Sequence, residues 1–368
     1  MTSICLRPAR RAKHVRVAPC LATRIISDQP SLRLAGIPEK TAKFTPPAHF
    51  GAGAERVASV KFVTPERVYL TGSVANGGCL RIYPGTSSAV ADVAVEVPKG
   101  YYAEKDYLDH RYHAKRFAYL QLLQQHLSRA KWVASASISA HHGDIRKPCL
   151  LVSAAKTKDM CLRVLLTAPA DTFPASRLLP DKANLRNLDE VDGERAPSPN
   201  YNQSILEDMF VEEHGKFLRD ATGEVEYLED ACLLLKVWAA RRGMLGAPDG
   251  FSGFVLSVLM THLVTTGGKL SPLMDTQQLV KAALTFLSDP KVLSGGFSAA
   301  AQQPLGRWKR AFPFVLIGPC GNVNIGARVS KSAIAEFAHE AALSAAVLER
   351  GERTAFEQVF LSAMYPAV

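Results

Sequence analysis

Residues 68–98 read VYLTGSVANGGCLRIYPGTSSAVADVAVEVP and are the most informative part of this 368-residue chain. The pattern from residue 60 to residue 71 predicts short strands, and the last of them runs directly into Gly72-Ser73. After a glycine-rich turn and a loop, residues 90–97 form an apolar run that predicts a buried strand, and this run carries Asp92. The sequence therefore predicts a Gly-Ser turn followed by an acidic strand of the same sheet.

Polymerase-type nucleotidyltransferases use such an arrangement. A Gly-Ser pair seats the triphosphate, and a carboxylate-x-carboxylate motif on one strand face holds two divalent ions in line with the transferred phosphate. Here Asp92 stands at the first position of the motif and Ala94 at the second. Gly72, Ser73 and Asp92 are therefore candidates for a vestigial nucleotide or phosphate seat, because the backbone N–H groups of such a turn can bind an anion without a metal. The structural alternative is that the glycine permits a tight turn while Asp92 pairs within the sheet.

The other acids of this region do not complete a metal site. Alternate side chains of a strand share a face, so Asp92, Ala94 and Glu96 point the same way. Glu96 lies four residues from Asp92, about 13 Å at about 3.3 Å per residue, whereas paired catalytic ions sit about 3.5–4 Å apart. A third carboxylate is expected on a later strand, but the run at 161–166 contains none and Asp159 precedes it. We therefore predict no catalytic residue, no metal site and no cofactor.

The composition is typical of a globular protein long enough for two domains. Hydrophobic residues make up 47% of the chain and charged residues 21%. The longest mostly apolar run, residues 253–264, is about half of the roughly 20 residues that a membrane span needs. The seven cysteines form no CxxC pair, which favours a reducing compartment and no zinc site or disulfide framework.

The formal net charge of +10 is concentrated in two segments. Residues 1–27 contain six Lys and Arg and no acid, while residues 99–131 carry seven cations against three acids. The rest of the chain is neutral on balance, so the basic character is local. The N-terminal segment resembles an organelle transit peptide or a nuclear or nucleolar address, and a disordered start or a mispredicted exon fits it equally.

A basic helix is the best candidate for RNA contact. Apolar residues at helical spacing predict a helix from Asp106 to Ala130. Its cations suit phosphate groups, and its His and Tyr rings suit unpaired bases. The alternative is a solvated face on which Asp106 and Asp109 offset the cations. The candidates for an RNA- or partner-binding surface are Lys99, Lys105, Arg111, His113, Lys115 and Arg116, and Lys236, Arg241 and Arg242 form a weaker second patch near a helix C-terminus.

The chain divides into four predicted segments. They are a basic, largely disordered start (1–54), a mixed sheet flanked by helices (55–168), a Pro-rich linker (169–200) and a mainly helical domain with a small strand element (201–368). Helices are expected at 228–242, 251–264, 276–287 and 330–348, with a strand at 312–317.

Seven segments in unbroken order carry a family resemblance. They are Thr71-Gly72-Ser73, ADVAVEVPKGYYAEKDYLDHRYHAKRFAYL (91–120), YNQSILEDMFVEEH (201–214), LLLKVWAARRGMLG (233–246), GFSGFVLSVL (250–259), GNVNIGARVSKSAIAEFAHEAALS (321–344) and FEQVF (356–360). Together they resemble the Nrap family, the nucleolar RNA-associated proteins of the small-subunit processome. The resemblance covers about residues 55–362, and DYLDHRYHAKR and GFSGF are its most specific parts.

The resemblance implies an α+β fold. A nucleotidyltransferase-like mixed sheet flanked by helices would precede a helical domain similar to that of poly(A) polymerases and oligoadenylate synthetases. It also implies a degenerate nucleotidyltransferase, used as a non-catalytic scaffold for pre-ribosomal RNA processing in the nucleolus. The implied partners are pre-ribosomal RNA and other processome proteins, including a casein-kinase-containing subcomplex, and no membrane. Family members are much longer, so the chain is expected to be a fragment, a truncated gene model or a divergent short form.

Two other functions are compatible with the residues. The first is an active nucleotidyltransferase that recruits its missing metal ligand from a loop or a partner, with Asp144 and Asp159 as the nearby acids. The second is a protein-interaction module without nucleic-acid contact. Salt separates the second from an RNA-binding protein, because binding through several phosphates weakens steeply as salt rises.

Overall fold

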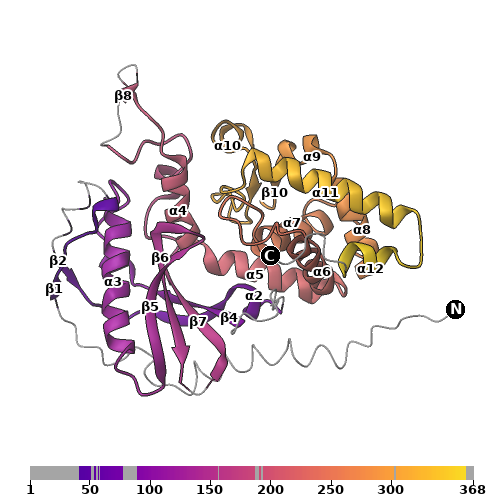
Figure 1. Cartoon of the computed structure of the whole chain (residues 1–368). Coiled ribbons are helices and arrows are strands. Elements are labelled where there is room, and N and C mark those ends of the chain that lie inside the picture. The colour runs from indigo at the N-terminus through magenta and orange to yellow at the C-terminus, as the bar shows by residue number, and fades with distance from the viewer. Residues whose placement is uncertain are drawn as a thin grey trace.

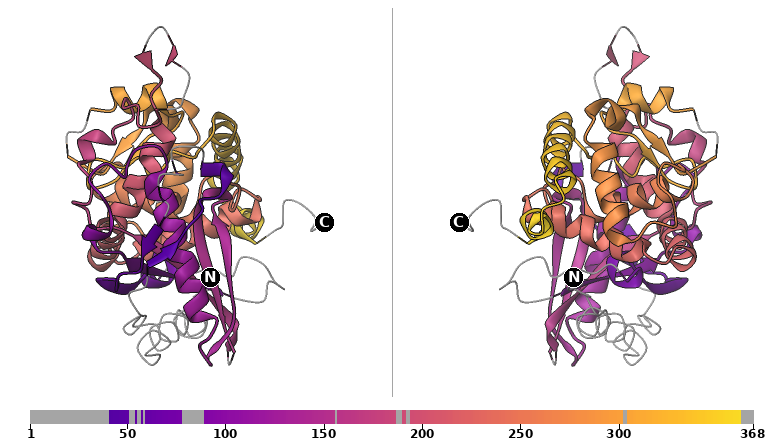
Figure 2. Two further views of the ribbon diagram at one scale, coloured as in Figure 1. Left: turned by 90° about the vertical axis from the view of Figure 1, so that its left-hand side faces the viewer. Right: turned by 90° about the vertical axis from the view of Figure 1, so that its right-hand side faces the viewer.

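The computed structural model (Figure 1) describes residues 41–361, apart from positions 51–53, 55, 56, 58, 78–88, 156, 187–189, 192, 193, 302 and 303. The basic start of the chain and the side chain of Asp159 lie outside the described part. Two lobes are visible in Figure 1, one built on a sheet and one built of helices. Figure 2 shows the molecule from its two sides, where one lobe lies in front of the other.

A five-stranded sheet forms the first lobe, in the order β3–β4–β7–β6–β5. β4 and β7 are parallel, and the other neighbouring pairs are antiparallel, so the predicted mixed sheet is confirmed. A separate antiparallel pair, β1–β2, precedes it. The strands are β1 (Thr41–Lys43), β2 (Ser59–Lys61), β3 (Arg67–Thr71), β4 (Ala89–Glu96), β5 (Val133–His141), β6 (Asp144–Ala154) and β7 (Thr157–Thr167).

One long helix, α3 (Arg111–Leu127), packs against β5 and β6. Its Tyr119 and Leu123 belong to the same buried cluster as Val93 and Val95 of β4. Because successive strand residues alternate, this burial leaves Asp92 and its neighbours on the opposite face of the sheet. That opposite face is turned toward the helical lobe.

The helix α3 begins later than its apolar spacing predicts, at residue 111 instead of 106. Asp109 and His110 both have positive φ, 52° and 59°, which ends any helix through them. Asp106 accepts a hydrogen bond from the backbone N–H of Ala103 (2.7 Å) and so stabilises a turn there. The segment 103–110 is consequently a structured loop in front of the helix.

The second lobe is mainly helical, as predicted, and holds a two-stranded parallel element, β10–β11. Serine or aspartate caps begin four of its helices: the side chains of Ser252, Asp275, Asp289 and Ser330 each accept a backbone N–H. Within the described ranges, every helix is too short or too polar to cross a membrane. The elements are α5 (Val211–Glu224), α6 (Leu228–Arg241), α7 (Gly253–Val264), α8 (Thr276–Leu287), α9 (Pro290–Gly295), β10 (Phe297–Ser298), α10 (Gly306–Ala311), β11 (Leu316–Ile317), α11 (Lys331–Glu349) and α12 (Ala355–Phe360).

The Pro-rich stretch between the lobes is partly packed. Phe173 is 1% exposed, and its ring meets those of Tyr102 and Tyr112 with centroids 5.9 Å away in each case. After the short strands β8 (Glu190–Val191) and β9 (Glu194–Arg195), helix α4 (Pro199–Met209) stands between the lobes (Figure 1). Most of its residues are buried, including polar ones, so α4 is the main structural connection between the two lobes.

Candidate functional site

Asp92 is paired with an arginine on the neighbouring strand. The sheet register places Thr71, Asp92 and Arg163 side by side on β3, β4 and β7. Arg163 Nε donates to Asp92 Oδ1 at 2.6 Å, and the Asp92 side chain is only 12% exposed. Burial lowers the pKa of Arg163, but the charge of Asp92 outweighs this effect and raises it overall. An arginine thus neutralises the carboxylate at the place where a nucleotidyltransferase needs additional negative charge.

The next row of the same face is apolar or already paired. Ala94, at the second motif position, is fully buried and lies beside Tyr69 of β3 and Leu165 of β7. Glu96 accepts two hydrogen bonds from Arg67, from Nε at 2.9 Å and from Nη2 at 2.7 Å. It is therefore occupied as an ion-pair partner and does not reach Asp92.

The residues present do not fit a pair of catalytic ions. Asp144, the loop acid considered as a relocated ligand, accepts a hydrogen bond from the backbone N–H of Arg146 at 2.8 Å, next to the β5–β6 turn. Among the described residues no group of three or more His, Cys, Asp or Glu side chains is arranged to hold a metal. Two ions bridging a phosphate need several converging carboxylates, whereas the two carboxylates of this face, Asp92 and Glu96, are each paired with an arginine and do not converge.

Gly72 packs directly on the Asp92 carboxylate. Its φ is +68°, and a Cβ added there would lie 2.3 Å from Asp92 Oδ2. Ser73 follows in α2 (Gly72–Ala75), a single turn that lines the cleft together with Thr71 and Asp92. The structure thus brings Gly72, Ser73 and Asp92 together, as the sequence predicts, and a close backbone approach accounts for the glycine.

We expect Gly72→Ala to destabilise the fold more than Gly243→Ala does. Gly243 has nearly the same backbone angle, φ +69°, but open space where a Cβ would stand. Both variants carry the cost of a left-handed alanine, about 1 kcal/mol, and only Gly72→Ala also displaces the Asp92–Arg163 pair, for about 1–3 kcal/mol more. Urea denaturation of both variants measures the difference. Equal losses of unfolding free energy in the two variants would show that the close contact between Gly72 and Asp92 does not affect stability.

The cleft between the lobes has a volume of about 440 Å³ and is lined from both sides. Gly72, Ser73, Asp92 and Arg163 come from the sheet lobe, and α5, α6 and α7 contribute the opposite wall. The charged lining residues are the cations Lys147, Arg163, Lys236 and Arg328 and the acids Asp92, Glu207, Asp208 and Glu229. Four cations and four carboxylates cancel formally, so the cleft has no excess positive charge to attract a triphosphate.

One lining histidine gives the protein a pH-dependent stability. His214 is buried in the cleft wall, with Nε2 3.6 Å from Cys320 Sγ. Burial lowers the pKa of His214 to about 4, with a smaller opposite effect from the charge of Glu207. Since histidine in an unfolded chain titrates near 6.5, only the unfolded state binds this proton between pH 6.5 and 4. Stability from this residue is present above pH 6.5 and is lost as the pH falls toward 4.

We therefore expect His214→Gln to reduce the acid sensitivity of the protein. By linkage, wild-type His214 accounts for about 2 kcal/mol of the stability lost between pH 7 and pH 5. Between pH 7 and pH 5 the free energy of unfolding should therefore drop by about 2 kcal/mol less in the variant than in the wild type. This difference does not depend on the stability of the variant at pH 7. His339→Gln, at an exposed position, is the control. An unchanged difference between pH 7 and pH 5 in His214→Gln would contradict this assignment.

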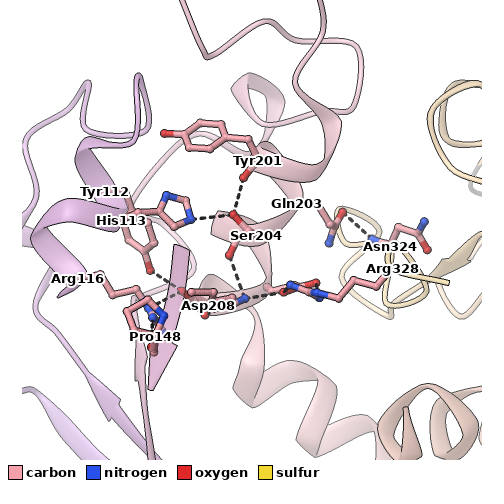
Figure 3. A network of polar contacts seen from close by, with 12 residues as sticks. Tyr112, His113, Arg116, Pro148, Tyr201, Gln203, Ser204, Asp208, Asn324 and Arg328 are labelled. Atoms are coloured by element: carbon pink, nitrogen blue, oxygen red, sulfur yellow. Dashed lines mark hydrogen bonds and ion pairs between the residues drawn. The ribbon is translucent and has the colours of Figure 1, made fainter. Parts of the chain in front are cut away.

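A buried polar network connects the lobes through α4 (Figure 3). At its centre, Asp208 of α4 forms ion pairs with Arg116 of α3 (3.0 Å) and Lys147 of β6 (3.2 Å) and accepts a hydrogen bond from Tyr112 (3.1 Å). Lys147 also binds Glu207 at 2.5 Å.

The same network reaches the helical lobe. Arg328 donates to both carboxylate oxygens of Glu207, at 2.5 and 2.9 Å. Gln203 Oε1 accepts from the backbone N–H of Asn324 at 3.0 Å, on the same side of α4 in Figure 3. Burial raises the pKa of Glu207, but the charges of Arg328 and Lys147 hold it well below the ordinary value. The network therefore keeps Glu207 ionised and fixes α4 against both lobes.

The structure corrects part of the predicted basic surface. Arg116 is 0% exposed and His113 is 2% exposed, where His113 Nε2 lies 2.8 Å from Ser204 Oγ of α4. Both residues hold the lobes together and are removed from any surface that RNA reaches. The helix was predicted to display them because net charge along a sequence does not show which cations have buried partners.

The other candidates are more accessible, but most have acidic partners. Lys115 pairs with Asp106 at 2.6 Å, and Lys99 pairs with Asp171 at 2.8 Å. Arg111 is 3.9 Å from Asp109 and donates to the carbonyl of Leu108. Lys105 is exposed. In the weaker second patch, Arg241 is exposed, whereas Lys236 is buried and Arg242 is buried against Glu340 (3.2 Å).

Comparisons with known protein families match nearly the whole described chain. The model described as "Nrap protein domain 1" matches residues 32–224, and the model described as "Nrap protein PAP/OAS-like domain" matches residues 227–363. Among curated proteins, Nucleolar protein 6 of Homo sapiens is 31% identical over 78% of this chain, and that of Mus musculus is 30% identical over 83%. U3 small nucleolar RNA-associated protein 22 of Schizosaccharomyces pombe is 30% identical over 57%.

The chain spans about a quarter of the length of these Nucleolar protein 6 relatives, 26% of the human and 27% of the mouse protein. Solved structures share the fold at low identity. The Cid1 poly(U) polymerase bound to MgGTP aligns with a TM-score of 0.54 at 12% identity, over 96% of this chain and 99% of that one. CdnC of E. coli MS115-1 with ATP aligns with a TM-score of 0.52 at 14% identity, over 97% and 91%. The predicted fold class, a nucleotidyltransferase-like mixed sheet flanked by helices and followed by a mainly helical PAP/OAS-like part, is thereby confirmed.

Proposed function

This chain belongs to the Nrap family, and from that membership and the geometry of its cleft we propose that it is a non-catalytic, RNA-associated platform for ribosome assembly in the nucleolus. The names of its relatives, Nucleolar protein 6 and U3 small nucleolar RNA-associated protein 22, support the location and the association with RNA processing. Pre-ribosomal RNA and other small-subunit processome proteins, including a casein-kinase-containing subcomplex, are the proposed partners.

The Asp92–Arg163 ion pair is the observation that carries the non-catalytic part of this proposal. Nucleotidyl transfer needs ions that bridge the attacking and leaving oxygens, and those ions need unpaired carboxylates. Here the remaining carboxylate is bound at 2.6 Å by an arginine, and Ala94 next along the same face is buried and uncharged. Gly72, Ser73 and Asp92 are then a vestigial seat that supports the fold of the cleft.

The platform part of the proposal is supported by the network around α4. The carboxylates Glu207 and Asp208 are bound by Arg116 of α3, Lys147 of β6 and Arg328 of the loop before α11. Such a network holds the two lobes in one arrangement, whereas an enzyme that admits and releases nucleotides benefits from lobe opening. A fixed arrangement suits a protein that positions other molecules on its surface.

Primer extension tests the proposal. We expect the protein to add no nucleotide to a single-stranded RNA primer in the presence of Mg²⁺ or Mn²⁺ and each of the four NTPs, while retaining the primer in a binding assay. Cid1 poly(U) polymerase under the same conditions is the positive control for extension. Extension that is lost in Asp92→Ala would show an active enzyme with a relocated ligand, and absence of RNA retention would favour a protein-interaction module.

A further inference from the structure

The segment from α9 to the first turn of α11 contains a concentration of positive charge that the overall charge balance conceals. Between Asp289 and Glu336 the sequence has six Lys and Arg and no acid. Three of these cations, Arg307, Lys309 and Arg310, lie within the six residues of α10. Acids elsewhere in the chain balance these cations in the net charge, but they are distant in the sequence. The local excess of positive charge is what attracts a polyanion.

The fold of α10 directs these three cations outward. Trp308 is 1% exposed and Phe312 is 4% exposed, and the two rings are stacked with centroids 6.4 Å apart. They form a small separate core with Val315 and Ile317. Residues four apart in a helix share one face, so 308 and 312 anchor α10. Arg307, Lys309 and Arg310 are all exposed, and Figure 1 shows α10 at the outer edge of the helical lobe.

The α10 cations also lack the acidic partners that cations of the predicted basic surface have. Within the part of the chain that the structure describes, no ion pair or side-chain hydrogen bond engages Arg307, Lys309 or Arg310. Lys99 and Lys115, by contrast, are each bound to a carboxylate at 2.8 and 2.6 Å. A cation held by a carboxylate must give up that partner to bind phosphate, and an unpaired exposed one does not.

We propose that Arg307, Lys309 and Arg310 form a binding surface for the phosphate backbone of single-stranded RNA. The inference rests on the proposed RNA association and assigns it to a different element from the basic helix at 111–127. RNA is favoured over an acidic protein because three cations within four residues match closely spaced backbone charges, and two of them are arginines, whose fork binds phosphate through two hydrogen bonds.

The test is the salt dependence of RNA binding by the whole chain. A fluorescent single-stranded oligo(U) RNA of 20 nucleotides is titrated by anisotropy at several salt concentrations. We expect the variant Arg307→Gln/Lys309→Gln/Arg310→Gln to bind about 100-fold more weakly at 0.1 M salt, with a slope of log affinity against log salt reduced by about 2, since each single-strand phosphate contact contributes about 0.7. The charge-preserving variant Arg307→Lys/Arg310→Lys should keep most of the slope.

A matched control separates this surface from net charge. Lys216→Gln/Lys269→Gln/Lys281→Gln removes the same number of positive charges from other parts of the chain, and we expect its affinity to fall no more than a few-fold. A slope and affinity unchanged in the α10 variant, or an equal loss in the control, would overturn the inference while the proposed function stands. Failure of the wild-type chain to bind the RNA would remove both. A polyglutamate peptide of equal charge that binds α10 more tightly than the RNA would assign the surface to an acidic protein and also overturn it.

Discussion

Asp208→Ala should cost the protein about 3–5 kcal/mol of stability, because it leaves buried charges without a partner. Arg116, which is fully buried, and Lys147, which is 4% exposed, would both lose their contact with this carboxylate. The hydroxyl of Tyr112 would lose its acceptor as well. An intact buried ion pair contributes little net stability, because the attraction mainly offsets the desolvation of the two ions. Removing one ion leaves the desolvation of the others without compensation, so the loss of stability is much larger than the net contribution of the pair.

The same variant should uncouple the two lobes. Asp208 connects α3 and β6 of the sheet lobe to α4, which Glu207 and Arg328 tie to the helical lobe. We therefore expect wild-type unfolding in urea to follow one transition and Asp208→Ala to follow two. Asp220→Ala, which removes the partner of exposed Lys216, is the control and should change stability by less than about 1 kcal/mol. A loss below about 1 kcal/mol in Asp208→Ala would contradict the role given to the network.

Arg163→Asp should make the stability of the protein depend on divalent cations. The substitution places a second carboxylate beside Asp92 on the adjacent parallel strand, and neighbouring strands are about 4.8 Å apart. Two carboxylates at about 5 Å repel by about 3 kcal/mol at an effective dielectric constant of about 20. In a chelator we therefore expect the variant to be destabilised by about that amount.

Addition of Mn²⁺ should recover much of this loss, because an ion that binds only the folded state stabilises it by mass action, about 2.7 kcal/mol at 100 times its Kd. The thermal midpoint measured with and without Mn²⁺ reports the effect. Arg163→Met removes the arginine without adding a carboxylate, so it should show no metal dependence. A variant Arg163→Asp whose midpoint is the same with and without Mn²⁺ would show that this face is not the remnant of a metal centre.

Much of the fold could be predicted from local signals. The buried strand at 90–97, the apolar helix at 251–264 and the capped helix at 276–287 are all present with nearly the predicted bounds. These elements are marked by a continuous apolar run or a side-chain cap, and neither signal depends on distant contacts. The start of α3 was predicted wrongly because the left-handed Asp109 and His110 interrupt a pattern that continues to look helical.

The parts of the site that depend on pairing across the fold could not be predicted. The sequence shows that residues 161–166 lack a carboxylate, but only the register of β4 against β7 shows that Arg163 faces Asp92. Likewise, the sequence DYLDHRYHAKR predicts a basic surface, and only the position of α4 shows that part of this stretch is buried. His113 and Arg116 then turn out to bind Ser204 and Asp208, about 90 residues away in the chain.

The net charge of long segments also does not reveal the exposed cations of α10, because their exposure depends on the fold. Summing cations and acids over long segments gave neutrality outside two basic stretches, although the acid-free segment from residue 290 to 335 contains six cations. The burial of Trp308 and Phe312 decides which of those cations face solvent, and that burial is a property of the folded lobe.

Binding of Mn²⁺ to the wild-type chain, followed by electron paramagnetic resonance, tests most directly whether Arg163 has replaced the metals at Asp92. We predict that free Mn²⁺ stays equal to the added Mn²⁺ up to millimolar concentration, with and without ATP, and that Asp92→Ala gives the same titration. Binding of two ions per chain that disappears in Asp92→Ala would contradict the account.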